Sequence, residues 1–372
     1  MTELDITFGD EQALILETAQ NFARQNSSPL GVRKLFGSDL GYDQAVWRQM
    51  AELGWTGLVV PEAQGGSGLG AGDAVSIVEA FGRHLLASPL VPALLAARAL
   101  AECANQHEGA AQCLTKIAAG SIATVALSEP GQGWNLRQPS CKAERSGGGR
   151  IALSGRKCHV PFASVADAIV TTVTFEGSPQ LLLLSRSDIP PGALRREICV
   201  DESQRVFRVS LDGLTVDARG MLPARESGIE ALIRDATLLL TAEMCGGIAG
   251  ALDTTLEYLK TRKQFGRLIG SYQALKHPVV DIYTHYELLR SLLYGAATAA
   301  GGDKAWRLTQ MAKAKASDLF VHAGDRAVQF HGGFGFTHDC DAGLYLRRAM
   351  WAQSQLGDGA FHRCSLADQL LV

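Results

Sequence analysis

Apolar residues recur at helical spacing through the first third of the chain. A helix is predicted to begin at Phe8–Asp10, and a second is predicted over Asp43–Leu53. Gly54 suits the left-handed cap that would end the second helix. After a glycine-rich loop (GWTGLVVPEAQGGSGLG), the helical pattern returns over residues 71–83 and 92–103. We therefore predict an α-helical N-terminal domain over residues 1–118.

The middle of the chain has a different pattern, because short apolar stretches alternate with turn residues from about Ser121 to Arg219. Gly147–Gly149, Pro190–Pro191 and Asp212–Gly213 are typical of turns. The stretches between the turns that are expected to form strands are IATVALSEP, GRIALSG, DAIVTTVTF, PQLLLLS and RVFRVSLDGLTV. This pattern predicts a small β domain over residues 119–222.

The helical period returns near Ile229 and holds to the end of the chain. It predicts a C-terminal four-helix bundle within residues 223–372, with helices over 226–262, 272–300, 303–331 and 341–371. Gly246 and Gly250 on the first of these helices allow another backbone to approach closely. The predicted fold is therefore mainly α with a central β domain. A terminal bundle of this kind is often an oligomer interface, although packing within one chain explains it equally well.

Composition narrows the classes of function. The formal net charge is −3 and no block of five like charges occurs, so neither nucleic acid nor an anionic membrane is an expected partner. The longest apolar runs are too short to cross a bilayer, and the acidic start (MTELDITFGDEQ) does not resemble a signal peptide. The eight cysteines lack C-x-x-C spacing, which favours buried thiols in a cytoplasmic protein over disulfides or a metal site.

The stretch Thr261–Gln273 (TRKQFGRLIGSYQ) concentrates groups that suit a flat, phosphorylated ligand. Arg262 offers a planar fork of donors for phosphate, and the ring of Phe265 can stack on another ring. Gln264 and Gln273 can read polar edges. The alternative is an ordinary polar corner between two helices, and residue types alone do not separate the two.

Four motifs, in this order and spacing, resemble those of the acyl-CoA dehydrogenase family. The glycine loop from Gly54 to Gly66 is similar to the family's G-W-x-G…P-E-x-x-G-G pattern, and Leu127–Pro130 (LSEP) is similar to its T-E-P turn. The stretch from Arg262 to Gln273 matches R-x-x-F-G-x-x-I-x-x-x-Q, and Gln329–Gly333 matches Q-x-x-G-G. The resemblance covers nearly the whole chain.

The resemblance implies FAD as cofactor, shared across a subunit interface. One subunit of such a dimer holds the isoalloxazine ring and the acyl-CoA substrate, and its neighbour clamps the ADP end. The residues of this chain that match the clamp, and so become candidate cofactor-binding residues, are Arg262, Gln264, Phe265, Gln273, Gln329, Gly332 and Gly333.

The resemblance also implies a catalytic glutamate, and this chain lacks one at the usual place. A general base must reach the proton that it removes, and the matching position is Leu356, which cannot accept a proton. The family's alternative position falls near Ala236. Asp235 and Glu243 near that position, and Asp358 two residues after Leu356, are weak substitutes, and a solvated or salt-bridged surface acid is the alternative interpretation of each. We therefore assign no catalytic residue.

A second departure affects the loop that faces the flavin in the family, K-x-W-I-T-N-G. Here the run is Lys157–Ala163 (KCHVPFA), with His159 at the Trp position and Pro161 at the Thr position. Proline supplies neither a hydroxyl nor an N–H to the flavin. Trp134 stands where the family has a small residue, and His159 is expected to be a partly buried histidine.

These losses favour one interpretation of three. The chain is predicted to be a non-catalytic subunit that pairs with a Glu-bearing acyl-CoA dehydrogenase in an α2β2 heterotetramer, passing electrons to an acceptor such as electron-transfer flavoprotein. This arrangement resembles the two-subunit enzymes of actinobacterial steroid side-chain degradation. The alternatives are a self-sufficient homo-oligomeric dehydrogenase with a relocated base such as Asp358, and a flavin-free acyl-CoA-binding or scaffold protein.

Overall fold

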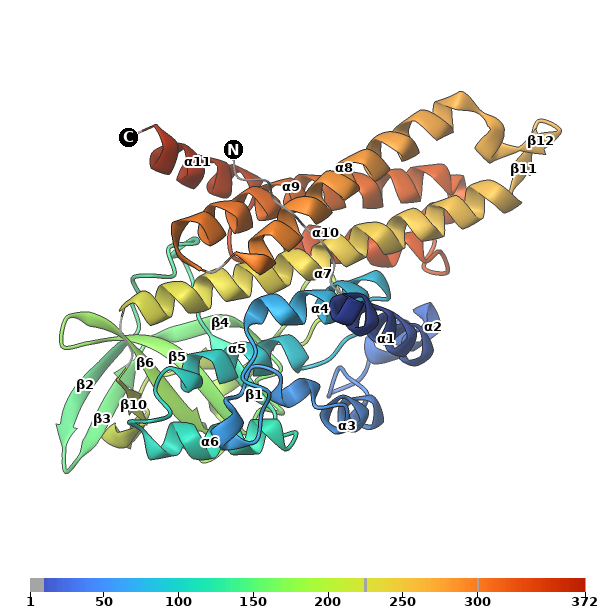
Figure 1. Ribbon diagram of the computed structural model, residues 1–372. Helices are drawn as coiled ribbons and strands as arrows, with labels where there is room; N and C mark the ends of the chain where they lie inside the picture. Colours follow the sequence, from blue (N-terminus) through green and yellow to red (C-terminus); the bar gives the residue numbers. More distant parts are fainter. Residues whose placement is uncertain (1–9, 224–225, 300, 372) are drawn as a thin grey trace. The chain divides into compact units, whose positions relative to one another are not determined.

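The computed structural model describes residues 10–223, 226–299 and 301–371, and two compact units are found within them (Figure 1). One unit combines the described residues up to Arg33 with Gly72–Leu86 and everything described from Thr237 onward. The other combines Lys34–Ala71 with Ala87–Ala236. The mainly α fold with a central β region is confirmed, whereas the division into domains 1–118, 119–222 and 223–372 remains a prediction.

The N-terminal third is helical, as predicted. Asp43 caps the helix α3 by accepting hydrogen bonds from Ala45 N and Val46 N, and Gly54 follows it with a φ of 77°. Phe8 and Gly9, at the predicted start of the first helix, lie outside the described residues. The helices of this part are α1 (Asp10–Asn26), α2 (Pro29–Leu35), α3 (Gln44–Glu52), α4 (Val75–Arg83), α5 (Leu90–Ala101) and α6 (Glu108–Ala118).

The middle third forms two sheets. The larger has the order β10-β6-β5-β2-β3-β9, with β1 pairing to β5 in parallel, and the smaller has the order β4-β8-β7. The strands that the alternating pattern predicted are β1 (Ala123–Ala126), β3 (Arg150–Ser154), β5 (Ala168–Phe175), β6 (Ser178–Ser185), β8 (Val206–Ser210) and β9 (Thr215–Asp217). The strands that it missed are β2 (Lys142–Gly147), β4 (Arg156–Pro161), β7 (Leu194–Glu197) and β10 (Met221–Leu222). Charged or very short stretches such as these carry little apolar alternation.

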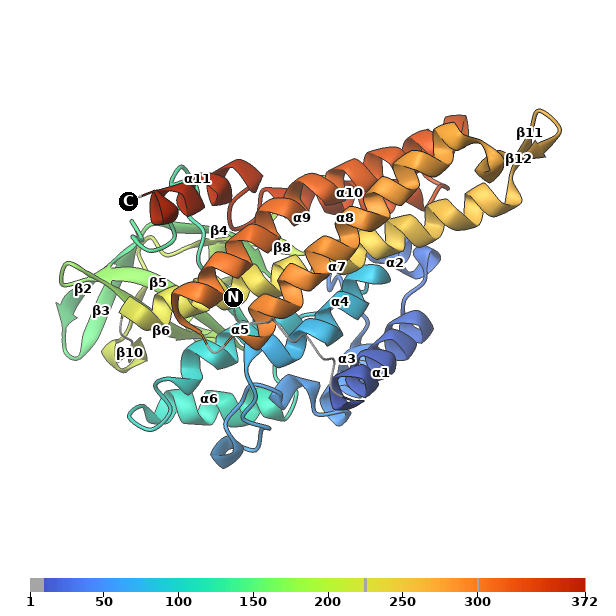
Figure 2. The ribbon, with the colours of Figure 1, turned by 45° about the horizontal axis from the view of Figure 1, so that its top comes forward.

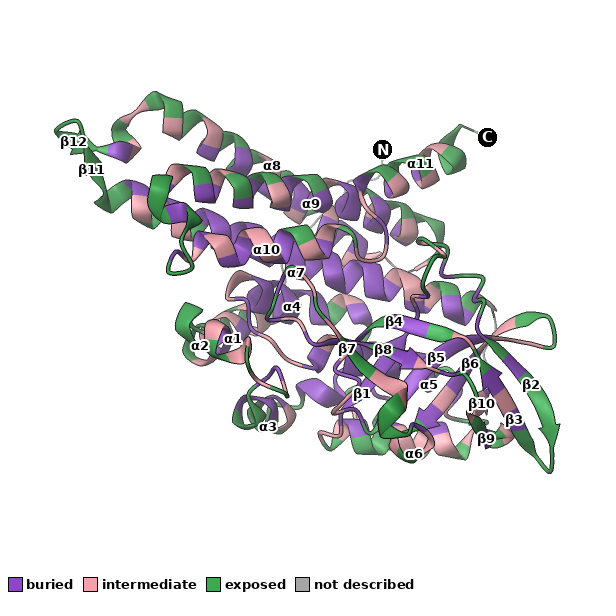
Figure 3. Ribbon diagram, turned by 180° about the vertical axis from the view of Figure 1, so that it is seen from behind, coloured by how far each residue is buried: buried purple, intermediate pink, exposed green. Residues whose placement is uncertain are grey.

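The C-terminal part, as far as the structure describes it, contains five long helices rather than the four that were predicted. They are α7 (Glu226–Thr261), α8 (Gln273–Thr298), α9 (Gly302–Phe330), α10 (Ala342–Gln353) and α11 (Gly359–Leu370). Figure 2 shows α8, α9 and α10 side by side, and Figure 3 shows buried residues along their inner faces. The predicted helix over 341–371 was wrong, because Leu356 and Gly357 have φ angles of 57° and 102°, which a helix cannot contain.

Glycines set the contact between α4 and α7. A Cβ on Gly246 would lie 1.8 Å from the carbonyl oxygen of Glu79, and one on Gly82 would lie 2.0 Å from that of Glu243. The predicted close backbone approach at Gly246 is therefore confirmed. Helix α7 is apolar and long enough to cross a membrane, but 94% of its most apolar window is buried inside the protein.

Two buried basic residues hold the turn between α10 and α11. Lys313 Nζ donates to Ser317 Oγ at 3.0 Å and to the carbonyl oxygens of Gln353 and Gly357 at 3.2 and 2.7 Å. His362 Nε2 donates to the carbonyl oxygen of Leu356 at 3.0 Å. Burial lowers the pKa of Lys313 to about 7, although Asp358 and Asp318 oppose the shift. The main chain around Leu356 is thus fixed by side chains other than its own.

The pKa of His362 predicts a loss of stability in acid. Burial and the neighbouring Lys313 lower it from 6.5 to about 4, so its contribution is fully present above pH 6.5 and is lost as the pH falls toward 4. The loss is on the order of 2–3 kcal/mol. Urea midpoints measured from pH 8 to pH 4 should therefore fall less in His362→Gln, whose amide still donates a hydrogen bond, than in the wild type.

The matched control for this measurement is His277→Gln on α8, whose side chain is exposed. It should follow the pH dependence of the wild type. If His362→Gln follows it equally, His362 does not carry the acid sensitivity.

Candidate functional site

A pocket with a volume of about 740 Å³ lies where α7 and α9 end and α8 begins. Its residues come from the last turn of α7, the connection to α8, the first turn of α8 and the glycine turn after α9. Figures 1 and 2 show the connection projecting beyond the ends of α7 and α8. The lining residues are Tyr258, Arg262, Gln264, Phe265, Ile269, Tyr272, Ala274, Leu275, Phe330, His331, Gly332, Gly333 and Phe334.

The connection is a β-hairpin followed by a 3-10 turn at Ile269–Ser271, rather than a plain helical corner. Strands β11 (Lys263–Gln264) and β12 (Arg267–Leu268) pair antiparallel, which leaves a loop of two residues. Phe265 and Gly266 in that loop have φ angles of 53° and 79°. Positive φ at both positions is the type I′ geometry, which is common for glycine and asparagine and strained for phenylalanine. The Phe265 side chain is 91% exposed as a result.

Arg262 supplies the positive charge of the pocket. Its main chain is held at both ends, because its N–H donates to the Tyr258 carbonyl and its carbonyl accepts from Ile269 N, each at 2.9 Å. Its exposed side chain makes no ion pair or hydrogen bond with any part of the chain that the structure describes. An arginine without a carboxylate partner is available to an anion.

The opposite wall is formed by the glycine turn at Gly332–Phe336. His331 stacks on Tyr258 with ring centroids 4.2 Å apart, which joins the end of α9 to α7. A Cβ built on Gly333 would meet nothing within 4 Å among the described residues. Packing there therefore does not require glycine at 333, and its open surface leaves room for a ligand to approach the main chain.

Only some of the predicted cofactor-binding residues line the pocket. Arg262, Gln264, Phe265, Gly332 and Gly333 line one pocket. Gln273 and Gln329 are exposed neighbours of the pocket and are not among its lining residues. The aromatic residues Tyr258, Tyr272, His331 and Phe334 were missed. Tyr258 stands four residues before Arg262, so helical periodicity would have placed it on the same face.

The residues present fit a dinucleotide's diphosphate end by their chemistry. The pocket combines a cation, an exposed aromatic ring, an amide and a wall of glycine. The cation suits phosphate oxygens, and the aromatic ring suits a flat ring of the ligand. The amide suits polar edges, and the glycines let phosphate approach the main chain.

The three candidate substitutes for the missing base all have partners within the chain. Asp235 is only 6% exposed, and its Oδ2 lies 3.2 Å from Arg98 Nε, so it is a buried ion-paired acid rather than a surface one. Glu243 pairs with Arg348 at 2.5 Å. Asp358 caps α11 by accepting a hydrogen bond from Phe361 N at 2.8 Å. Each carboxylate therefore already has a structural partner.

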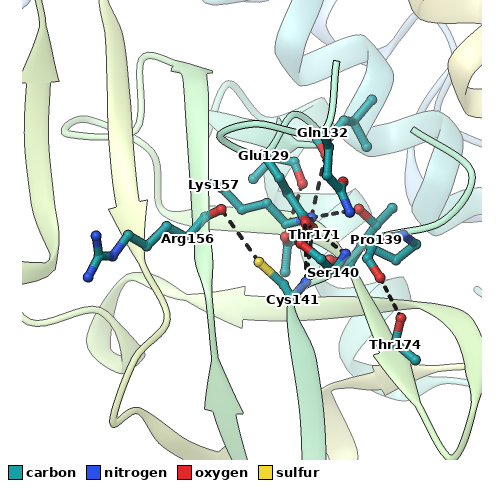
Figure 4. Close-up of polar contacts among 12 residues, drawn as sticks. Glu129, Gln132, Pro139, Ser140, Cys141, Arg156, Lys157, Thr171 and Thr174 are labelled. Atoms are coloured by element: carbon teal, nitrogen blue, oxygen red, sulfur yellow. Dashed lines mark hydrogen bonds and ion pairs between the residues drawn. The ribbon is translucent and has the colours of Figure 1, made fainter. Parts of the chain in front are cut away.

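A buried ion pair joins the LSEP loop to the start of β4 (Figure 4). Lys157 Nζ lies 2.6 Å from Glu129 Oε1, and both side chains are buried. Ser140 N also donates to Glu129, at 2.7 Å. Burial raises the pKa of Glu129, but Lys157 and Ser140 outweigh that effect and hold it below its ordinary value. The LSEP loop and β4 are therefore held together by buried polar groups that partner one another.

The end of β4 differs from its sequence prediction in one respect. His159 is exposed and not partly buried, because its φ of 52° turns it out of the strand at a break in the pairing with β8. Its N–H donates to Glu197 Oε2 at 2.7 Å. Pro161 pairs with Val206 and offers no N–H.

Comparison with known proteins gives matches along nearly the whole chain. Two family models match: the acyl-CoA dehydrogenase N-terminal domain over residues 9–121 and the acyl-CoA dehydrogenase C-terminal domain over residues 224–371. The acyl-CoA dehydrogenase IpdE2 of Mycobacterium tuberculosis is 30% identical over 91% of this chain and 91% of its own length.

Solved structures agree with this match. A variant of the Tcur3481-Tcur3483 steroid ACAD is 29% identical, with a TM-score of 0.87 over 98% of this chain and 99% of that one. The ChsE4-ChsE5 complex from Mycobacterium tuberculosis is 25% identical, with a TM-score of 0.89 over 99% of both. On these matches, the chain belongs to the acyl-CoA dehydrogenase family, whose cofactor is FAD.

Proposed function

We propose that this chain is a non-catalytic subunit of an FAD-dependent acyl-CoA dehydrogenase and clamps the ADP end of a flavin whose ring is held by a partner subunit. The observation that carries the proposal is the pocket in which Arg262 meets Gln264, Phe265 and two glycines. It is strengthened by Leu356, which stands in a well-fixed turn but has no carboxylate.

Each residue of the pocket has a distinct part in this function. Arg262 binds the diphosphate through its guanidinium, and Phe265 covers a flat part of the nucleotide. Gln264 reads polar edges, while Gly332 and Gly333 admit phosphate close to the main chain. Bound FAD supplies hydride acceptance during α,β-desaturation of an acyl-CoA thioester. The partner supplies the base.

The departures from the family pattern fall on one side of the composite site. The clamp residues are retained, whereas Leu356, Pro161 and His159 stand where proton removal and flavin contact are expected. A subunit that serves only its neighbour's cofactor needs the first group and not the second. This sorting is the reason to prefer a mixed complex over a degenerate enzyme.

The similar structures support a heteromeric assembly and a substrate class. Two of them are named as paired chains, and one of these is named as a steroid enzyme. We extend these features to this chain as an α2β2 tetramer that acts in the cytoplasm on a bulky acyl-CoA, such as one with a sterol side chain. Electron-transfer flavoprotein is the proposed acceptor. Neither nucleic acid nor membrane has a role in this proposal.

The second candidate is a self-sufficient homo-oligomer with Asp358 as base. The cap that Asp358 provides to α11 disfavours it, since a capping carboxylate is held by a backbone N–H group and kept away from substrate. A flavin-free scaffold leaves the retained Arg262 unexplained.

The test of the proposal is purification of the chain alone and together with a Glu-bearing acyl-CoA dehydrogenase subunit. The chain alone should be colourless, and the complex should be yellow and active. In the complex, Arg262→Ala should lower bound FAD at least tenfold at limiting flavin, because it removes a charge-assisted contact with phosphate. The ratio of absorbance at 450 nm to that at 280 nm measures it.

The matched control for this change is Arg307→Ala, an exposed arginine on α9 outside the pocket, which should keep full flavin content. A yellow, active homo-oligomer of this chain, or a full flavin load in Arg262→Ala, would refute the clamp in trans.

Gly333→Ala should separate ligand binding from folding. The added methyl group meets no atom of the described residues within 4 Å, so the thermal midpoint should stay within about 2 °C, while FAD affinity should fall about tenfold. Gly343→Ala in α10, also with open space around its Cβ, is the control and should leave both quantities unchanged. Unaltered FAD binding in Gly333→Ala would remove this glycine from the site.

A further inference from the structure

Tyr272 occupies a central place beside the hairpin, although no motif singles it out. It is the N-cap residue of α8 and lines the pocket with a half-buried ring. The Arg267 guanidinium carbon lies 4.0 Å from the centroid of that ring. The Phe265 ring meets it edge-on at 6.4 Å and 90°. Its hydroxyl donates to the Gln264 carbonyl at 3.3 Å.

The hairpin needs such support. It has only two pairs of residues, Lys263 with Leu268 and Gln264 with Arg267, and isolated two-stranded hairpins are marginal in water. The positive φ of Phe265 adds local strain. Contacts outside the ladder must therefore compensate. Tyr272 contacts three residues of the hairpin, which are Gln264, Phe265 and Arg267.

The rest of the connection is anchored separately. Ile269 N donates to the Arg262 carbonyl at 2.9 Å, and Gly270 lies so close to Leu259 that a Cβ would come within 2.7 Å of its carbonyl oxygen. These contacts fix the base of the hairpin on the last turn of α7. They do not include Gln264 or Phe265. Gln264 pairs with Arg267, whose guanidinium lies over the Tyr272 ring, and the Phe265 ring packs against that ring directly.

We propose that Tyr272 is a positioning residue that holds the Gln264–Phe265 tip in its ligand-binding shape before any ligand arrives. The role belongs to the ring, since Arg267 lies over its face and the Phe265 ring packs against it at 90°, while the hydroxyl makes a single long hydrogen bond. A preformed tip spares the ligand the entropy of ordering these side chains. The inference rests on the proposed clamp and adds to it a residue outside the family's motif.

Arg267 helps to hold the Tyr272 ring through a cation–π contact. Its guanidinium lies on the Tyr272 ring, and cation–π pairs of this kind are worth a few-fold to about tenfold in an equilibrium. Arg262 is left as the pocket's cation, because Arg267 is not among the residues that line it.

The experiment uses the complex of this chain with its Glu-bearing partner, stripped of FAD. Amide hydrogen exchange over residues 263–268 reports the order of the hairpin, and fluorescence titration reports the affinity for FAD, with ADP as competitor. Tyr272→Leu should speed exchange at least tenfold and weaken FAD and ADP about tenfold. Tyr272→Phe, which keeps the ring, should stay within about threefold of the wild type in both.

A double-mutant cycle with Arg267→Met gives a second readout. The effects of Arg267→Met and Tyr272→Leu on exchange should be less than additive, because each change removes the same cation–π contact. Tyr283→Leu, an exposed tyrosine elsewhere on α8, is the control and should leave exchange at 263–268 unchanged.

The outcomes distinguish this inference from the function on which it rests. If Arg262→Ala weakens FAD but Tyr272→Leu changes neither exchange nor affinity, the positioning role is refuted and the clamp stands. Equal losses in Tyr272→Phe and Tyr272→Leu would also refute the ring's role. If Arg262→Ala and Tyr272→Leu both leave FAD affinity unchanged, the clamp itself is refuted.

Discussion

The site depends on the β11–β12 hairpin, where the chain turns back between α7 and α8. Helices α7 and α8 are joined by residues 262–272, which contain a hairpin whose two-residue loop has positive φ at both positions. Gly266 accepts this geometry without strain, and Phe265 is forced to project into solvent. Because Arg262 directly precedes the first strand, its guanidinium, the amide of Gln264 and the ring of Phe265 come to line one pocket.

Arg262 differs from several other charged residues of its compact unit in having no partner among the residues that the structure describes. Glu243, Asp358 and Arg348 have close partners within the chain, whereas Arg262 has no such partner in the part of the chain that the structure describes. An exposed cation without a counter-ion loses little stability, and it is available to a ligand that brings its own negative charge. Under the proposed function, that ligand is the diphosphate of FAD.

The sequence predicted the long elements and placed Arg262 and Gln264 in one stretch, because helical periodicity and motif spacing are local signals. It missed β2, β4 and β7, whose side chains are charged and whose pairing depends on distant strands. It also missed the break at Leu356, because the predicted helix was extended across Gly357 and Asp358, which are typical of a helix end and a helix start. The sequence also did not single out Tyr272, because its contacts with Arg267, Phe265 and Gln264 form only once the hairpin is folded.

The main chain of the turn at Leu356 is held by side chains from other positions. Lys313 binds the carbonyl oxygens of Gln353 and Gly357, and His362 binds that of Leu356. All of these contacts are to main-chain atoms, so they do not depend on which side chain stands at 356. The turn keeps its shape with leucine as it would with glutamate. Under the proposed function, the partner subunit supplies the carboxylate, so this chain needs none at position 356.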